Sequence, residues 1–381
     1  MNNLPSKLLL TAAIAAATPS AYAAESIAEA FQNGSTSVSF RLRFEEVDVD
    51  GTPEVDALTL KSRLTYKTDA LNGFSGLVEF DDVTAIGYEE SEYISRIKDP
   101  EGTEVNQAYL AYAAGDTTVK LGRQRILLDN QRFVGGVGFR QNEQTYDALT
   151  VTNKSLPDTA LFYAYISEVN NIFGADAKHE THLVNAKYTG LPIGAVTAYY
   201  YQIEPESATD SIDTFGVRLA GSQPAGDAKI LYTAEYASQD TSTAEPDYYV
   251  LEGGVSVSGV TAKLGYEVLG SDNGVGFNTP LATKHKFQGW ADQFLGTPGT
   301  GIEDLYLTVG TKIAGVKLLA VYHDYEAETT SDDLGSEIGF VAAKKFGKNY
   351  GLSLKYADYD ASDASGKTDT SKLWLTASAK F

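Results

Sequence analysis

The sequence predicts an all-β fold, a transmembrane up-and-down antiparallel β-barrel of about 18 strands with short periplasmic turns and long extracellular loops. Apolar and polar residues alternate with a period of two in segments of about ten residues from Ser35 onward. The connections between these segments are alternately short and long. The last segment runs to an aromatic residue, Phe381.

The terminal segment, SKLWLTASAKF at 371–381, has apolar or small residues at every second position from Leu373 to Phe381. Such a strand would be an exposed edge at the end of a soluble sheet, whereas a closed barrel gives it a partner on both sides. A terminal strand that ends in Phe resembles the C-terminal signature of bacterial outer-membrane barrels. The alternative is an ordinary last strand of a soluble β domain.

The first 23 residues have the pattern of a secretory signal peptide. Lys7 is followed by a mostly apolar run, Leu8 to Ala17, and then by Ala21-Tyr22-Ala23, an A-x-A cleavage site. We therefore expect residues 1–23 to be a signal peptide and residues 24–381 to be a single barrel domain. Without Lys7 the mature chain has 29 basic and 51 acidic residues, a formal charge of −22.

The composition fits a barrel with a polar lumen. The chain has 24 Tyr, 16 Phe and 35 Gly, and its mean hydropathy is −0.21 although 43% of the residues are hydrophobic. After the signal peptide no apolar run approaches the ~18 residues that a transmembrane helix needs. The absence of cysteine excludes disulfides and thiol chemistry. The acidity argues against a nucleic-acid partner, and no pattern indicates a cofactor or a metal site.

The first expected strand, at 35–48, shows the alternation most clearly. Val38, Phe40, Leu42 and Phe44 lie on one face, and Arg41 and Arg43 lie on the other. Similar alternation places the other strands at 58–66, 74–81, 103–113, 117–127, 144–154, 158–168, 180–190, 194–204, 211–221, 226–238, 246–257, 260–270, 301–311, 315–327, 335–346, 350–360 and 371–381.

The connections favour a barrel that crosses a membrane. Short turns are expected at 71–73, 114–116, 190–194, 258–259, 314–315 and 347–349, and long loops at 84–102, 129–143, 169–179, 271–300 and 361–370. Tight turns on one rim and long loops on the other are typical of outer-membrane barrels.

If the apolar face contacts lipid, the charged face lines the lumen. The residues expected to line the pore or set its selectivity are Arg41, Arg43, Lys61, Arg63, Glu79, Asp81, Arg123, Arg125, Asp147, Lys187, Arg218 and Lys263, although the alternation around Arg123 and Arg125 is less regular. Rows of basic and acidic groups select solutes by charge and shape, and guanidinium groups pair with carboxylates. The alternative is that these charges neutralise one another and only keep the lumen hydrated.

Two loops are candidates for narrowing the lumen. The loop at 129–143 contains three glycines between Arg132 and Arg140, and it is expected to form a constriction that these arginines flank. The loop at 271–300 has Phe287, Trp290 and Phe294 at helical spacing. These aromatic residues predict a short amphipathic turn that packs against the barrel or plugs its mouth.

Two blocks resemble the alginate export family of outer-membrane proteins. They are LGRQRILLDNQRFVGGVGFRQNEQTYDAL at 121–149 and HKFQGWADQFLGTPGTGIEDLYLTVG at 285–310. The resemblance implies an 18-stranded, monomeric barrel whose lumen is constricted by arginines and acids, with Arg123, Arg125 and Asp147 as the residues carried over. The type member passes alginate outward. This chain is shorter, with briefer loops, so the substrate does not follow from the resemblance.

The function expected is a non-enzymatic porin in the outer membrane of a Gram-negative cell, for small hydrophilic, anionic solutes such as saccharides, uronates or organic acids. Its expected partners are outer-membrane lipids, lipopolysaccharide and the solute. The chain is expected to be a monomer, with a trimer as the alternative. The other hypotheses are a dedicated alginate or exopolysaccharide exporter, a surface adhesin, and a barrel enzyme using His179 and His182, the two histidines that lie closest together in sequence.

Overall fold

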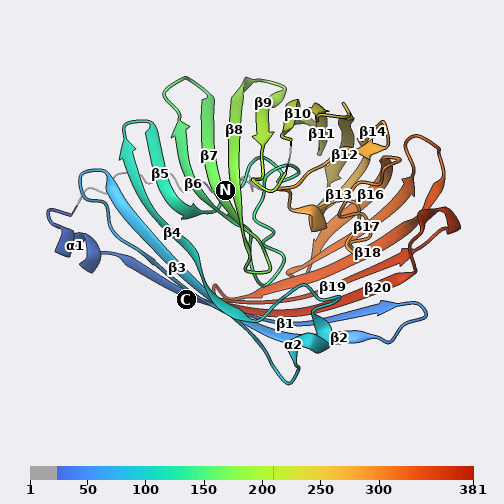
Figure 1. Ribbon diagram of the computed structural model, residues 1–381, viewed down its shortest axis with the longest axis horizontal. Coiled ribbons are helices and arrows are strands. Elements are labelled where there is room, and N and C mark those ends of the chain that lie inside the picture. The colour runs from blue at the N-terminus through green and yellow to red at the C-terminus, as the bar shows by residue number, and fades with distance from the viewer. Residues whose placement is uncertain (1–23, 209) are drawn as a thin grey trace.

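The computed structural model describes residues 24–208 and 210–381, so the expected signal peptide at 1–23 lies outside the described residues. The described chain folds into one 18-stranded antiparallel sheet that closes between β1 and β20 (Figure 1). The barrel strands are β1 (Ser35–Val49), β2 (Val55–Lys67), β3 (Phe74–Ala85), β4 (Gly102–Ala114), β5 (Thr117–Gln124), β6 (Thr145–Asn153), β7 (Thr159–Asn170), β8 (Asp176–Leu191), β9 (Gly194–Ile203), β10 (Ile212–Ala225), β11 (Ala228–Asp240), β12 (Asp247–Val257), β13 (Val260–Leu269), β16 (Ile302–Ile313), β17 (Val316–Glu326), β18 (Asp333–Phe346), β19 (Tyr350–Asp360) and β20 (Thr370–Lys380).

Every barrel strand pairs with its neighbours along the chain, and the terminal strand closes the ring as predicted. Ser39 lies opposite Lys380, and Val49 lies opposite Thr370. This pairing removes the exposed edges that an open sheet would have. The predicted fold class, including the number of strands, is confirmed.

The alternation separates two environments. On the outer face of β1, Phe40 and Leu42 are exposed, whereas Arg43 and Glu45 on the inner face are buried. Large exposed apolar side chains of the same kind lie on the outer face of all the barrel strands, such as Leu110 and Leu264. An apolar exterior around a charged interior is the arrangement that a lipid bilayer requires.

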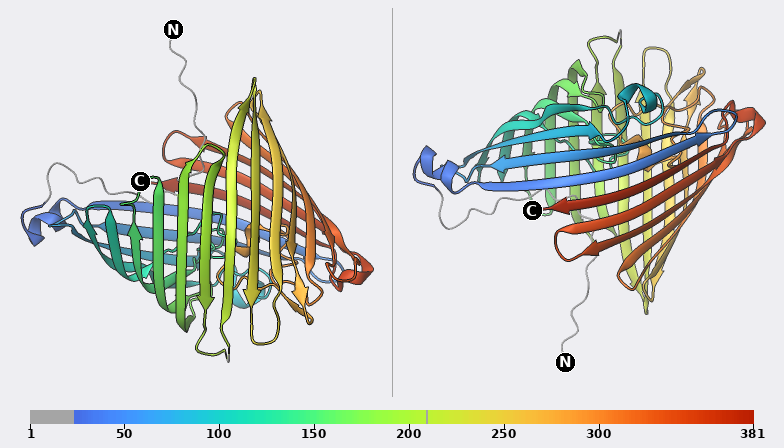
Figure 2. Two further views of the ribbon diagram at one scale, coloured as in Figure 1. Left: turned by 90° about the horizontal axis from the view of Figure 1, so that it is seen from above. Right: turned by 90° about the horizontal axis from the view of Figure 1, so that it is seen from below.

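The rims differ as expected (Figure 2). One rim carries turns as short as two residues, such as Ser258-Gly259 and Ala314-Gly315, in which both residues have positive φ. Such turns match the twist of paired antiparallel strands. The opposite rim carries the long connections 86–101, 125–144 and 270–301. The expected long loop at 169–179 is wrong, because β7 and β8 extend into it and leave only 171–175 between them.

Helices are few and short. The structure has α1 (Ile27–Gln32), α2 (Glu90–Tyr93) and the 3-10 turns η1 (Lys284–Lys286) and η2 (Asp363–Ser365), besides a small hairpin of β14 (Ser271–Asp272) and β15 (Val275–Gly276). Within 24–208 and 210–381, none of the helices has the length and apolarity to cross a membrane. The turn expected over Phe287, Trp290 and Phe294 is not helical, because the only helical turn in this loop is η1, which ends before Phe287.

Candidate functional site: a charged lumen held by two inward loops

The candidate site lies inside the barrel, where the long loops 125–144 and 270–301 fold inward onto the wall (Figure 1). Strands β1 to β3 supply charged side chains to this wall. Arg41 lies opposite Lys61, and Arg63 lies opposite Asp81. Residues directly opposite each other share a face, so the regular alternation of these strands brings the predicted residues Arg41, Arg43, Lys61, Arg63, Glu79 and Asp81 to the inner wall.

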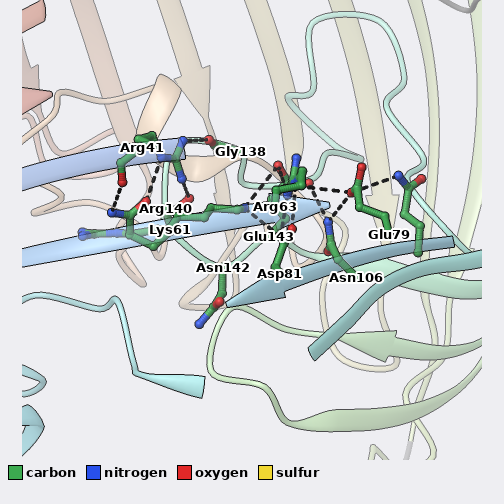
Figure 3. Close-up of polar contacts among 12 residues, drawn as sticks. Arg41, Lys61, Arg63, Glu79, Asp81, Asn106, Gly138, Arg140, Asn142 and Glu143 are labelled. Carbon is green, nitrogen blue, oxygen red and sulfur yellow. Dashed lines mark hydrogen bonds and ion pairs between the residues drawn. The ribbon is translucent and has the colours of Figure 1, made fainter. Parts of the chain in front are cut away.

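Glu143, from the loop 125–144, is the centre of the largest ionic network (Figure 3). Its carboxylate lies 3.0 Å from Nη2 of Arg63 and 3.8 Å from Nζ of Lys61, and it accepts a hydrogen bond from Arg125. Arg125 also pairs with Glu79. The predicted residue Arg125 thus faces the interior, but from just beyond the end of β5.

The same network continues along the wall through Asp81. Arg63 donates to both Asp81 oxygens at 2.6 Å, the bidentate geometry that guanidinium groups favour, and Nζ of Lys61 lies 2.8 Å from Asp81. Burial alone would raise the pKa of Glu143, but Lys61, Arg125 and Arg63 hold it well below its usual range. Glu143 is therefore ionised, and it fixes the inward loop to Lys61 and Arg63 of the wall and to Arg125 next to the end of β5.

Arg41 is the exception among the predicted arginines of this wall. Its guanidinium donates to Oε1 of Gln141 at 2.8 Å, to the carbonyl of Gly138 at 2.9 Å and to the carbonyl of Arg140. All three acceptors are neutral, and Arg41 makes no ion pair with another described residue. The side chain is partly exposed, so it presents to the lumen a positive charge that has no acidic partner in direct contact within the described chain.

Arg140 joins both inward loops to the barrel wall. Its Nη1 lies 3.0 Å from Glu45 on β1, and its Nη2 lies 3.2 Å from Asp292 in the loop 270–301. Asp99, from the β3–β4 loop, lies 4.0 Å away and accepts the backbone N–H of Gln141 at 2.7 Å. Burial would lower the pKa of Arg140, but Glu45, Asp99 and Asp292 raise it above its ordinary value.

Arg132 makes the second junction. Its Nε lies 2.9 Å from Glu267 on β13, and its Nη2 donates to Gln288 at 3.0 Å. The backbones of the two loops also bond directly, since the N–H of Gly135 donates to the carbonyl of Leu281 at 2.8 Å. The arginines predicted to flank a constriction, Arg132 and Arg140, therefore do lie inside the barrel, where they fasten the loops.

Aromatic packing seals the contact between the loops and the wall. The ring of Phe133 lies 5.2 Å from those of Tyr199 and Tyr248 and 5.9 Å from that of Phe277, all centroid to centroid. Phe294 packs on Tyr325 at 4.9 Å. Buried aromatic contacts of this kind stabilise by large apolar area as well as by ring geometry. The loops are thus packed elements of the interior.

A buried chain of polar groups ties the loop 270–301 to β19. Nδ1 of His285 donates to Asp292 at 2.6 Å, and Nζ of Lys355 lies 2.6 Å from Nε2 of the same ring. Burial lowers the pKa of His285 to about 3, so the ring is neutral at neutral pH and its Nε2 accepts from Lys355. The Lys355 ammonium also lies 4.0 Å from the ring centroid of Trp290, within the range of a cation–π contact.

On the wall formed by β8 to β13, opposite β1 to β3, there are only three predicted cations. Arg218 pairs with Glu235 at 2.5 Å, and Lys263 pairs with Glu252 at 2.8 Å. Lys187 lies opposite the inward-facing Thr197 near the short-turn rim. These three positions face the interior by register.

The placement of Arg123 and Asp147 in the lumen is wrong. Arg123 lies opposite Ala108 and Asp147, on the outer face that includes Leu121, which is 63% exposed. Arg123 and Asp147 pair at 2.8 Å on the outside of the barrel, toward the long-loop rim. The inner face of these strands carries Gln124 and Tyr146.

Neutralising Arg123 is therefore expected to leave ion selectivity unchanged. An Arg123→Gln variant removes a charge that the barrel wall separates from the lumen, so its reversal potential in a salt gradient should equal that of the parent protein. The measurement is made in planar bilayers. A shift toward cation preference in this variant would place Arg123 in the lumen after all.

The histidine pair considered for an enzyme is split between the two faces of β8. His179 faces inward and contacts Thr181 at 3.0 Å, whereas His182 lies 2.9 Å from the Tyr163 hydroxyl on the outer face. The two rings do not form one site. Among residues 24–208 and 210–381, no group of three or more metal-ligating side chains is present.

Several residues of the site were missed in the sequence. Asp99, Glu143 and Asp292 lie in loops, where no alternation indicates direction. One signal did exist for Glu143 and Asp292: each lies in a block, at 121–149 or 285–310, that combines arginine or lysine with acids and aromatic residues. A loop rich in such residues is more readily explained by packing on a charged wall than by free exposure to water.

The comparisons with known proteins agree with this fold. A family model described as "Alginate export" matches residues 35–269. The sequence has no significant match among curated proteins. Similar solved structures include Acinetobacter baumannii OccAB2, with 14% identity, a TM-score of 0.74 and coverage of 92% of this chain and 99% of that chain. Pseudomonas aeruginosa OpdK, solved with vanillate, has 14% identity, a TM-score of 0.72 and coverage of 92% and 99%.

Proposed function

Because the chain belongs to the alginate export family and is an outer-membrane β-barrel, we propose that it is a porin through which small hydrophilic, anionic solutes diffuse along the charged wall of β1 to β5. The candidate solutes are saccharides, uronates and organic acids. The membrane lipids are its partners on the apolar exterior.

One observation carries this proposal: charged side chains are only partly covered inside the barrel. The side chain of Arg63 is 17% exposed and that of Arg125 is 23% exposed. Burying ionised groups without water is costly even when they are paired. The partly exposed arginines of this wall are therefore more stable if water fills a passage beside the inward loops.

The preference for anions rests on Arg41. The acids of the wall neutralise Arg63 and Arg125, whereas Arg41 has only neutral acceptors. A single unmatched charge in a narrow aqueous passage attracts anions and repels cations. No observation in the structure favours a dedicated exporter over this porin.

Single-channel recording of the refolded protein in planar bilayers tests the proposal. We expect discrete conductance steps and a reversal potential on the anion side. Arg41→Gln is expected to lower the anion-to-cation permeability ratio about tenfold, because one charge about 6 Å from the ion path in water stabilises an anion and destabilises a cation by about 0.7 kcal/mol each. Arg123→Gln on the outer wall is the matched control. A folded barrel that does not conduct would refute the proposal.

A further inference from the structure

The short-turn rim, which faces the periplasm in outer-membrane barrels, has an uneven charge distribution. Strand register turns a set of lysines at this end toward the interior. Five of them lie on neighbouring or nearly neighbouring strands between β16 and β2: Lys312, Lys317, Lys345, Lys380 and Lys67. We call these five residues the lysine arc. Each lies at the last or second-last position of its strand on that rim.

The arc has no acidic partners. Among the described residues, no acidic side chain faces inward within the five residues of any barrel strand that lie nearest this rim. The acids at this end lie in the turns and in the N-terminal segment that contains α1, namely Asp69, Asp116, Asp158, Asp227, Glu25 and Glu29. None of the five lysines makes an ion pair within 4.0 Å with another described residue, whereas Lys263, deeper in the barrel, pairs with Glu252.

The densest part of the arc places like charges next to each other. Lys312 lies directly opposite Lys317 in the β16–β17 pair. Lys317 lies opposite Ala343, which puts Lys345 at the diagonal position on β18. All three are exposed. Like charges directly opposite each other on a sheet are destabilising. The pairing of Lys312 with Lys317 therefore does not contribute to the stability of the barrel.

We propose that Lys312, Lys317 and Lys345 form a binding site for small multivalent anions at the periplasmic mouth of the barrel. Neighbouring strands lie about 4.8 Å apart, so the three backbones span about 10 Å. An anion with three or more charges, such as an oligophosphate or a tricarboxylate, bridges ammonium groups at this spacing. A monovalent anion neutralises only one of them.

The site is separate from the central network. The arginines of the wall, except Arg41, are matched by acids that also hold the loops, whereas the charge of the arc is free for a ligand. The acidic side chains of the barrel strands lie toward the other end of the barrel. Near the long-loop rim the outer face carries acids such as Asp48, Glu303 and Asp358. The arc is therefore expected to attract multivalent anions at the periplasmic mouth.

The inference rests on the proposed porin function only where it predicts that a bound anion reduces the channel current. Binding itself can be measured on a protein that does not conduct. Inorganic tripolyphosphate and citrate are titrated calorimetrically into the full-length mature protein in detergent at low salt. The variant Lys312→Gln/Lys317→Gln/Lys345→Gln is expected to bind tripolyphosphate at least about tenfold more weakly, because three close charges are lost. Citrate binding identifies a general multivalent-anion site, and binding of tripolyphosphate alone identifies a phosphate site.

Lys344→Gln is the matched control. Lys344 lies next to Lys345 on the same strand end but on the outer face, with its Nζ 5.5 Å from the ring centroid of Phe346. This variant should bind like the parent protein. Folding of all variants is checked by the shift in gel mobility on heating. Equal affinity in the parent and the triple variant would overturn the inference.

Side-specific addition in planar bilayers completes the test. Tripolyphosphate added at the periplasmic face should reduce the current, whereas the same concentration at the extracellular face should not, and the triple variant should lose the block. Block from both faces with equal affinity would overturn the inference. Lysine-dependent binding by a barrel that does not conduct would refute the porin and leave the anion site in place.

Discussion

Replacing residues 277–296 by a short Gly-Ser linker is expected to raise single-channel conductance several-fold. An 18-stranded barrel without inward loops encloses a lumen wide enough for an aqueous channel. In this protein the segment holds Leu281, Gln288 and Asp292, through which the loop 125–144 and the wall are joined. Without it, the central part of the lumen loses one of its two packed loops.

The control for this change is a deletion at the same rim that does not reach the interior. Residues 363–366, which include η2, lie in the exposed β19–β20 connection. Their removal should leave conductance unchanged while the shift in gel mobility on heating shows a folded barrel. If the variant lacking 277–296 folds and conducts no more than the parent protein, this loop does not limit the current.

The strands could be predicted because a barrel in lipid makes alternation a strict requirement. The wall of a barrel contacts lipid on one side and water or packed loops on the other. Each strand therefore alternates apolar and polar residues with a period of two. β1 shows this without exception from Phe40 to Glu45. The turns were equally visible, because two-residue connections need residues that accept positive φ, as at Ser258-Gly259.

The direction of individual side chains was predictable only where alternation is unbroken. A bulge between Glu79 and Phe80 shifts the β3–β4 register, and β5 ends at Gln124. Arg123 and Arg125 are two residues apart and so appear to share a face. Arg123, however, lies in β5 on the face of Leu121, whereas Arg125 has left the strand and turns inward. The exposed Leu121 and Leu149 were the available signal, since they share a face with Arg123 and Asp147.

The loop contacts could not be predicted because they depend on distances through space. Gln141 and Thr59 are 82 residues apart in sequence, yet Nε2 of Gln141 donates to the Thr59 hydroxyl at 2.8 Å. Arg140 meets Asp292, which is 152 residues away. Such pairs follow from how two loops fold into one lumen. The sequence indicated which loops were unusual, but it contained no information on which wall each would contact.

Arg140→Met is expected to destabilise the inward loops by roughly 3–5 kcal/mol, the usual cost of removing one partner from buried ion pairs. The substitution keeps most of the side-chain volume but leaves Glu45, Asp99 and Asp292 without the cation they share. The buried carboxylates then repel each other, and the junction between the two loops and β1 loosens. Proteolysis of the loops at native conditions should become faster, and open-channel noise should increase.

The matched control is the same substitution at Arg96, an arginine of the β3–β4 loop whose hydrogen bonds to Pro53 and Thr52 are exposed. Arg96→Met should change neither measurement, because an exposed guanidinium contributes little to stability. If Arg140→Met resists proteolysis as well as the parent protein, the aromatic contacts around Phe133 hold the loops by themselves. In that case the ionic junction affects only the charge of the lumen, and the variant should shift the reversal potential toward cations while the conductance noise stays unchanged.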